Sequence, residues 1–222
     1  MDAARKAVMK RQVEKTMENL RKNRMEAYYV DTAAEVPAQV EALMREGDVA
    51  AVGGSMTLAQ TGVLDLLRSG RYRFLDRYAP GLDEEQVRQI FLESFSADVY
   101  LASANAVTMN GELYNVDGNS NRVAAICYGP RSVILVVGCN KIVPDLDAAV
   151  RYVKQVSAPA NAVRLHCPTY CAAAGSCQGL GKNGMTDGCG TDARICCNYV
   201  VSARQREAGR IKVILVGEPL GY

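Results

Sequence analysis

The chain has 222 residues, of which 49% are hydrophobic, and its 26 lysines and arginines nearly balance its 24 aspartates and glutamates. This length and composition favour a soluble globular protein with one domain and a small appendage. The near balance of charge gives no field strong enough to dominate nucleic-acid binding, so we expect no nucleic-acid partner. The longest strongly apolar run, Val133 to Val137, is far shorter than the roughly 18 residues of a membrane-spanning helix, so we expect no membrane span.

The N-terminal residues 1–26 predict a basic amphipathic helix, which precedes an α/β domain over residues 27–222. Residues 1–24 hold eight lysines or arginines against three acidic residues. Apolar residues recur at helical spacing on the other side of this helix, at Met9, Val13, Met17 and Leu20. The basic face fits a solvated surface or, alternatively, a docking surface for an acidic partner. The chain is charged from its second residue and shows no apolar signal segment, so we expect a cytoplasmic protein.

Strand and helix patterns alternate over the first half of the domain. The expected strands are Ala27–Val30, Asp48–Val52, Tyr72–Leu75 and Val99–Ala102, and the expected helices are Thr32–Glu46, Met56–Leu67 and Val87–Phe95. Asp31 or Thr32 is the expected cap of the first of these helices. Such an alternation is typical of βαβ units, so the sequence predicts an α/β fold with an open, mostly parallel sheet flanked by helices.

The second half of the domain adds a hairpin, a central strand and a Cys-rich loop. Ala106–Met109 and Glu112–Val116 flank Asn110-Gly111, a dipeptide typical of a type I′ β-hairpin turn. The run Ser132–Val137 is apolar enough to be buried on both faces, which predicts a central strand. The remaining expected elements are a helix at Asp145–Gln155, the Cys-rich loop at 167–197, a helix at Asn198–Glu207 and a strand at Lys212–Val216.

A glycine turn, Gly53-Gly54-Ser55, stands where an expected strand ends and an expected helix begins. Free backbone amides and the positive end of a helix dipole make such a turn suited to phosphate or carboxylate, with Ser55 and Thr57 as further donors. A tight connection in which Ser55 only caps the helix remains the alternative.

Two further loops offer polar groups near the ends of strands. The stretch Tyr114 to Arg122 gathers hydrogen-bonding side chains and one cation around Gly118, and the stretch Val137 to Lys141 closes the next strand in a similar way. Strands of an open parallel sheet deliver such loops to one crevice at their carboxyl ends. We expect Asp117, Arg122 and Lys141 to act in catalysis, as an acid-base group, a carboxylate clamp and a cation or amine nucleophile. The expected ligand-binding residues are Gly53, Gly54, Ser55, Thr57, Asn115, Gly118, Asn121, Gly138 and Asn140.

Six of the eight cysteines fall within 31 residues, at Cys167, Cys171, Cys177, Cys189, Cys196 and Cys197. In a reducing compartment, clustered cysteines are typical of a metal or redox centre, since thiolates suit zinc and iron-sulfur clusters. Reduced structural thiols and disulfides are the alternatives. His166, the one histidine, is a ligand, a general base or a structural group. The sequence shows no nicotinamide or flavin fingerprint.

The segments VGGSMT, GELYNVDGNSNRVA, GPRSVILVVGCNKIV, ARICCNYV and GRIKVILVGEPLGY resemble the LUD-domain family of lactate utilisation proteins. This resemblance implies a fold similar to ribose-5-phosphate isomerase and the CoA transferases, with a binding crevice beside the glycine turn. The family is linked to lactate oxidation together with iron-sulfur partner subunits. The resemblance also implies four metal-ligating cysteines at Cys171, Cys177, Cys189 and Cys196, with Cys167 or Cys197 as alternatives, although Gln178 to Gly188 is an insertion relative to the family.

Together these features favour an accessory or redox component of the utilisation of lactate or another 2-hydroxy acid, with a thiolate-bound iron-sulfur cluster (4Fe-4S) or zinc. One alternative is an enzyme that acts on a small anionic metabolite, a sugar phosphate or CoA thioester, in the glycine-loop crevice. The other is an interaction subunit, possible as a homo-oligomer, with structural zinc.

Overall fold

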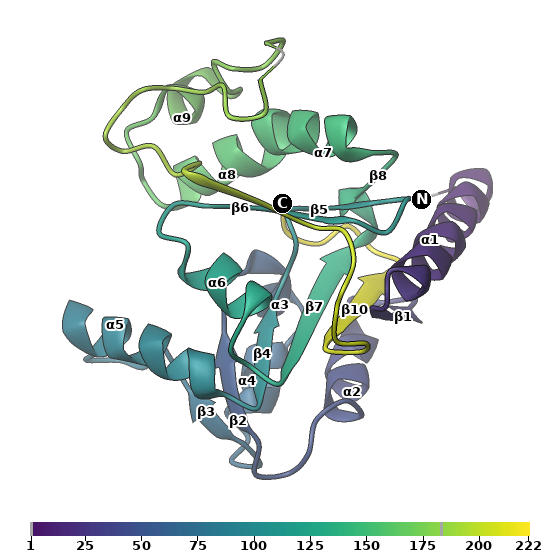
Figure 1. The fold of residues 1–222 in the computed structure, drawn as a ribbon, viewed down its shortest axis with the longest axis vertical. Helices are drawn as coiled ribbons and strands as arrows, with labels where there is room; N and C mark the ends of the chain where they lie inside the picture. Colours follow the sequence, from purple (N-terminus) through teal and green to yellow (C-terminus); the bar gives the residue numbers. More distant parts are fainter. Residues whose placement is uncertain (1, 183) are drawn as a thin grey trace.

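A six-stranded parallel sheet forms the centre of the protein, which we describe from a computed structural model covering residues 2–182 and 184–222 (Figure 1). All neighbouring strands in this sheet run parallel, as the alternation of elements predicts. The strand order is β1 (Glu26–Val30), β10 (Ile211–Val216), β7 (Ser132–Gly138), β4 (Val99–Ala102), β2 (Val49–Val52) and β3 (Arg73–Leu75). The predicted central strand is confirmed, because β7 pairs with a strand on each side.

Helices cover both faces of this sheet. Val133, Leu135 and Val137 of β7 point into one core with α1 and α6, whereas Ile134 and Val136 point into a second core with α2, α3 and α4. This alternation follows from the two-residue period of a strand, and it explains why β7 is apolar at each position from Val133 to Val137. The helices that accompany the six-stranded sheet are α1 (Ala3–Lys22), α2 (Val36–Glu41), α3 (Met56–Gln60), α4 (Val63–Leu67), α5 (Glu84–Glu93) and α6 (Asn121–Cys127). The 3₁₀ turns are η1 (Ala33–Glu35), η2 (Ser94–Ser96) and η3 (Cys139–Lys141).

A second, four-stranded sheet carries the Cys-rich segment on its far side (Figure 1). Its strands are β8 (Ile142–Val143), β5 (Ala106–Thr108), β6 (Leu113–Asp117) and β9 (Asn198–Ser202). It packs against α7 (Leu146–Tyr152), a π-helical turn η4 (Val153–Ser157) and α8 (Ala158–Arg164), and α9 (Tyr170–Ala174) begins the Cys-rich segment. The predicted hairpin, β5 and β6, therefore belongs to this second sheet and not to the parallel sheet. None of the described helices is both long and apolar enough to cross a membrane.

Three predicted helices differ from the structure. The prediction of a helix at Asn198–Glu207 is wrong, because residues 198–202 form β9 and pair with β6 along its whole length. The predicted helix at Thr32–Glu46 is shorter, since the α-helical turns start at Val36, where Pro37 favours a first turn, and end at Glu41. The predicted helix at Met56–Leu67 is broken at Gly62, whose φ is 72°.

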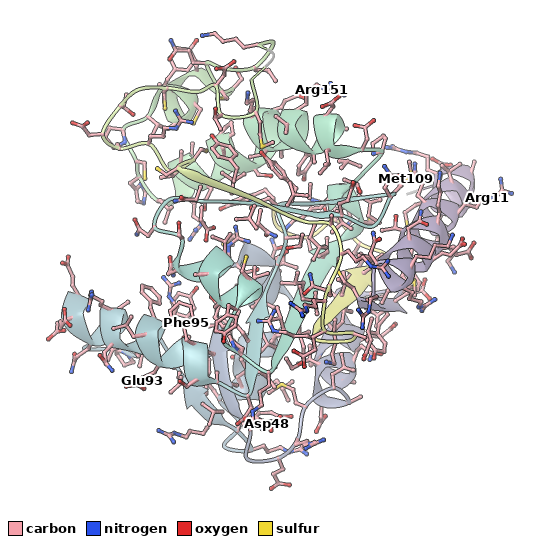
Figure 2. The ribbon with its side chains drawn as sticks, in the orientation of Figure 1. Arg11, Asp48, Glu93, Phe95, Met109 and Arg151 are labelled. Carbon is pink, nitrogen blue, oxygen red and sulfur yellow. The ribbon has the colours of Figure 1, made fainter. Side chains whose placement is uncertain are left out.

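The hairpin turn between β5 and β6 also differs from its prediction. A type I′ turn needs a positive φ at both central residues, but only Gly111 has one, at 82°. The turn is closed by the Gly111 amide, which donates to the Thr108 carbonyl. It packs on α1, where the Asn19 side chain donates to the carbonyl of Met109 over 2.7 Å, and Figure 2 shows Met109 beside this helix. The turn thus joins the N-terminal helix to the second sheet.

We expect Gly111→Ala to lower the free energy of unfolding because a Cβ at this position would lie 2.5 Å from the backbone carbon of Asn19. Gly47 is the matched control, since its φ of 83° is nearly the same and no atom lies within 4 Å of its Cβ position. Gly47→Ala should cost about 1 kcal/mol from backbone strain alone, and Gly111→Ala about 1–3 kcal/mol more from the collision. Urea unfolding of both variants measures the difference, and equal losses would contradict the contact with α1.

Candidate functional site

A crevice of about 700 Å³ lies where the carboxyl ends of the parallel strands face the second sheet and the Cys-rich segment. The loop after each of five strands, β2, β3, β4, β7 and β10, places at least one residue at it, as expected for an open parallel sheet. The predicted site residues that border it are Gly54, Ser55, Asp117, Gly118, Asn121, Arg122 and Lys141. The other predicted residues do not border it: Gly53 and Asn115 contact Arg122, Thr57 contacts Lys141, and Gly138 and Asn140 contact the C-terminal residues.

Arg122 is buried at the wall of the crevice and is saturated with hydrogen bonds. Each of its five N–H donors has a partner among the described residues: the Asp117 carboxylate at 2.6 and 2.9 Å, the Asn115 and Asn105 side chains, and the carbonyls of Ser103 and Val116. A guanidinium so engaged has no donor left for a ligand carboxylate in this conformation. The arrangement indicates that Arg122 positions the crevice walls, whereas its predicted role as a clamp requires these bonds to open.

Arg122 contacts both Asp117 and Gly53. The Asp117 carboxylate accepts two bonds from the guanidinium and one from the Val123 amide, and the last of these caps the start of α6. The acid-base role of Asp117 stays a prediction. A Cβ on Gly53 would lie 2.9 Å from Cγ of Arg122, which explains why the first residue of the glycine turn has no side chain.

Lys141 is 2% exposed and borders the floor of the crevice. Its Nζ donates to Thr57 Oγ1 at 3.0 Å and to Ser103 Oγ at 3.1 Å. No Asp or Glu among the described residues forms an ion pair with it. Burial, with a smaller effect from the Arg122 charge, lowers the pKa of Lys141 to about 7. A buried lysine without a counter-ion is costly to fold, and such groups cluster at functional sites.

Gly138 and Asn140 bind the C-terminal residues of the chain to the sheet. The Asn140 side chain accepts from the Leu220 amide at 2.9 Å and donates to the Gly221 carbonyl at 3.1 Å. A Cβ on Gly138 would lie 2.5 Å from the Leu220 nitrogen, so this close approach requires glycine. These contacts bring Tyr222 to the crevice, where its buried hydroxyl has no hydrogen-bond partner among the described residues.

Arg77 is one of the crevice residues that the sequence analysis missed. It follows β3, and its guanidinium carbon lies 4.6 Å from the ring centre of Phe91 and 5.1 Å from that of Tyr78. Its NH1 is 3.6 Å from the Cβ position of Gly54, and its buried Nε has no partner among the described residues. The amides of Gly54 and Ser55 also have no backbone partner in the described chain. The one available signal was a cation just after a strand, a position shared with Lys141.

The four cysteines predicted as metal ligands line one small cavity of about 20 Å³ in the Cys-rich segment: Cys171, Cys177, Cys189 and Cys196. The alternative ligands do not line it; Cys197 borders the large crevice, and His166 is exposed in the turn after α8. All eight cysteines are free thiols. Burial, followed by the neighbouring Cys177 and Cys171, raises the pKa of the Cys196 thiol to about 12.

Two cations border the same cavity. Lys154, on the π-helical turn η4, is buried and donates to the carbonyls of Gly179 and Gly184. Arg194 donates to the carbonyls of Cys189 and Cys196. The donor set suits a thiophilic metal, and the cations would offset the negative charge of the thiolates. In the described part of the chain, however, no three His, Cys, Asp or Glu side chains lie close enough together to hold a single metal ion as they stand.

The sequence model of the LUD domain matches residues 13–216. The chain belongs to the LUD family. A crystal structure of a DUF162 family protein from Deinococcus radiodurans covers 95% of this chain and 98% of its own, at 20% identity and a TM-score of 0.49. That of eIF2B beta from Chaetomium thermophilum covers 51% and 43%, at 20% identity and a TM-score of 0.35. No curated protein sequence matches the chain significantly.

The LUD match begins within α1, so it includes the second half of the basic helix. Met9, Val13 and Leu20 of this helix are buried in the core on one face of the six-stranded sheet, whereas Arg11 points outward in Figure 2. The helix is therefore packed on the domain along its apolar side. Its exposed basic side fits both the solvated surface and the docking surface considered above.

Lys141→Met should stabilise the protein at low pH. Below pH 7 the folded and the unfolded chain both hold the Lys141 proton, and the folded state bears the full cost of burying the charge. Between about pH 7 and the ordinary lysine pKa of 10.5 the unfolded chain binds more protons, so wild-type stability rises with pH. The advantage of the variant should thus shrink by on the order of 2 kcal/mol between pH 6 and pH 9.

Urea unfolding of both proteins at pH 6 and pH 9 measures this change. Lys15→Met, which removes an exposed lysine of α1, is the matched control and should show no such pH dependence. A constant difference between wild type and Lys141→Met across this range would contradict a lowered pKa.

Proposed function

We propose that this LUD-domain protein binds a small organic anion, bearing a carboxylate or a phosphate, in the crevice. One observation carries the proposal: Arg77 and Lys141 both border the crevice, and neither forms an ion pair among the described residues. Unpaired cations in a partly enclosed space lack the counter-charge that stabilises them, and an anionic ligand supplies it.

The residues around these cations suit an anion of a few carbon atoms. Arg77 lies against Gly54 of the glycine turn, and Lys141 donates to Thr57 in the helix that follows it, so at most about 11 Å of backbone separates the two contacts. The planar fork of Arg77, held by stacking on Phe91, is suited to a carboxylate or phosphate group. The free amides of Gly54 and Ser55 offer further donors at the same place.

Family membership supports a 2-hydroxy or 2-oxo acid as the anion. The LUD family's link to lactate oxidation favours lactate or pyruvate, with this protein as an accessory or redox component beside iron-sulfur partner subunits. A sugar phosphate or a CoA thioester is the competing ligand class, since the same cations suit its phosphates. Calorimetric titration with lactate, pyruvate, ribose 5-phosphate and acetyl-CoA separates these two classes.

Arg77→Met should weaken binding of whichever of these anions binds by about 10- to 100-fold, because a charged, bidentate hydrogen bond is lost. Isothermal titration calorimetry at pH 6.5 measures the dissociation constants of wild type and variant. Arg73→Met is the control, since it removes an exposed arginine of β3 and changes the net charge equally. The proposal fails if none of the four anions binds wild type, or if both variants bind as wild type does.

The Cys-rich segment favours a second function, a thiolate metal centre. The supporting observation is the single cavity shared by Cys171, Cys177, Cys189 and Cys196 and bordered by Lys154. These four thiols would hold the centre once the glycine-rich backbone between them moved to bring them together. A 4Fe-4S cluster would supply one-electron transfer, whereas zinc would serve to fold the segment, as in an interaction subunit.

Serine substitution at any one of these four cysteines should lower the metal content of anaerobically purified protein by about tenfold or more, because a ligand is lost. Metal analysis with a visible spectrum measures the content and distinguishes an iron-sulfur cluster from zinc. Cys197→Ser is the matched control, because Cys197 is the chain neighbour of Cys196 but faces the other cavity. Wild-type protein without stoichiometric metal, or equal losses in Cys196→Ser and Cys197→Ser, would refute the metal centre.

A further inference from the structure

We propose that Lys141 is a nucleophilic amine that forms an imine with the carbonyl carbon of a small 2-oxo acid held in the crevice. The inference rests on the proposed function, because it requires the anion to bind beside Lys141. The imine adds two things to that function. The ligand would carry a carboxylate next to a carbonyl group, and it would become covalently attached to the protein.

The hydrogen bonds around Nζ leave the lone pair of the neutral amine free. Thr57 Oγ1 lies 3.4 Å from the Leu220 carbonyl and Ser103 Oγ lies 3.2 Å from the Ala104 carbonyl, so each hydroxyl proton is directed to a backbone oxygen. Both hydroxyls therefore accept from Lys141. A neutral amine has two N–H groups and one lone pair, and this network uses both N–H groups. The nitrogen lone pair has no hydrogen-bond donor in this network, so it can attack a carbonyl carbon.

The charges around Lys141 also favour the neutral amine. An ammonium group has a third N–H, for which no partner is found among the described residues. Arg122 is the charged group that acts on Lys141 directly, and it opposes a second positive charge. Asp117 forms its ion pair with Arg122, and its oxygens accept from Arg122 and the Val123 amide. Burial, followed by the Arg122 charge, lowers the pKa of Lys141 to about 7, which favours the neutral amine that a nucleophile requires.

The reaction needs no oxidant or reductant. The amine lone pair bonds to the carbonyl carbon, and the carbonyl π electrons move to the oxygen, which gives a carbinolamine. The two amine protons pass in turn from nitrogen to that oxygen, which leaves as water, and the nitrogen lone pair forms the C=N bond. The products are the imine and one water, and Arg77 would hold the carboxylate of the same molecule throughout.

Reductive trapping with pyruvate tests the inference. Wild-type protein with pyruvate and cyanoborohydride at pH 7 should gain about 72 Da, the mass of pyruvate less water plus two hydrogens, on a single lysine. Peptide mapping should assign this adduct to Lys141 at a rate at least tenfold above any other lysine. Lactate, which has no carbonyl carbon to react, should give no adduct. Lys141→Met should lose the adduct, whereas Lys15→Met should keep it.

Calorimetric titration with pyruvate distinguishes a failure of the imine from a failure of the proposed anion site. Pyruvate binding without preferential labelling of Lys141 overturns the imine and leaves the proposed anion site standing. Absence of both pyruvate binding and labelling also overturns the imine, and the other anions then decide the proposed function. Because the adduct is mapped on wild-type protein, the result does not depend on the folding of any variant.

Discussion

The buried guanidinium of Arg122 is the interaction on which the arrangement of the two sheets depends. Its acceptors come from the loop after β4, which belongs to the six-stranded sheet, and from β6, which belongs to the second sheet. The side chain itself projects from α6. Removing one member of such a buried network leaves several polar groups without partners, which is far costlier than losing a surface pair. The crevice exists because this network holds its two walls at a fixed separation.

With the walls fixed in this way, the floor of the crevice can hold an unfavourable group. Lys141 forms no ion pair within the described part of the chain and is opposed by the charge of Arg122, an arrangement that disfavours folding. The apolar cores on both faces of the six-stranded sheet supply the stability that offsets it, for example through Val133 to Val137, all fully buried. The buried Lys141 lowers the free energy of unfolding and the apolar cores raise it, a balance that is common in proteins with binding or catalytic sites.

The sequence was sufficient for most of the fold because local patterns and tertiary structure agree there. Apolar runs such as Ser132–Val137 predict strands at their observed places, and the parallel order predicts that the loops at Ser55 and Lys141 meet at one edge. The prediction failed at residues 198–202, where β9 is half exposed and owes its form to pairing with β6. Arg77 was missed because its place depends on stacking with Phe91, a residue of α5 that no local pattern connects to it. The sequence also could not predict that all the N–H donors of Arg122 have hydrogen-bond partners, because the acceptors come from separate segments of the chain.

Arg194 and Ile195 border both cavities, the large crevice on one side and the small cavity between the four cysteines on the other. This short stretch of backbone is therefore a partition with two faces, and Arg194 fixes it by bonds to the carbonyls of Cys189 and Cys196. A displacement of these two residues would change both cavities. The surroundings of the four cysteines and the shape of the large crevice therefore depend on the same two residues.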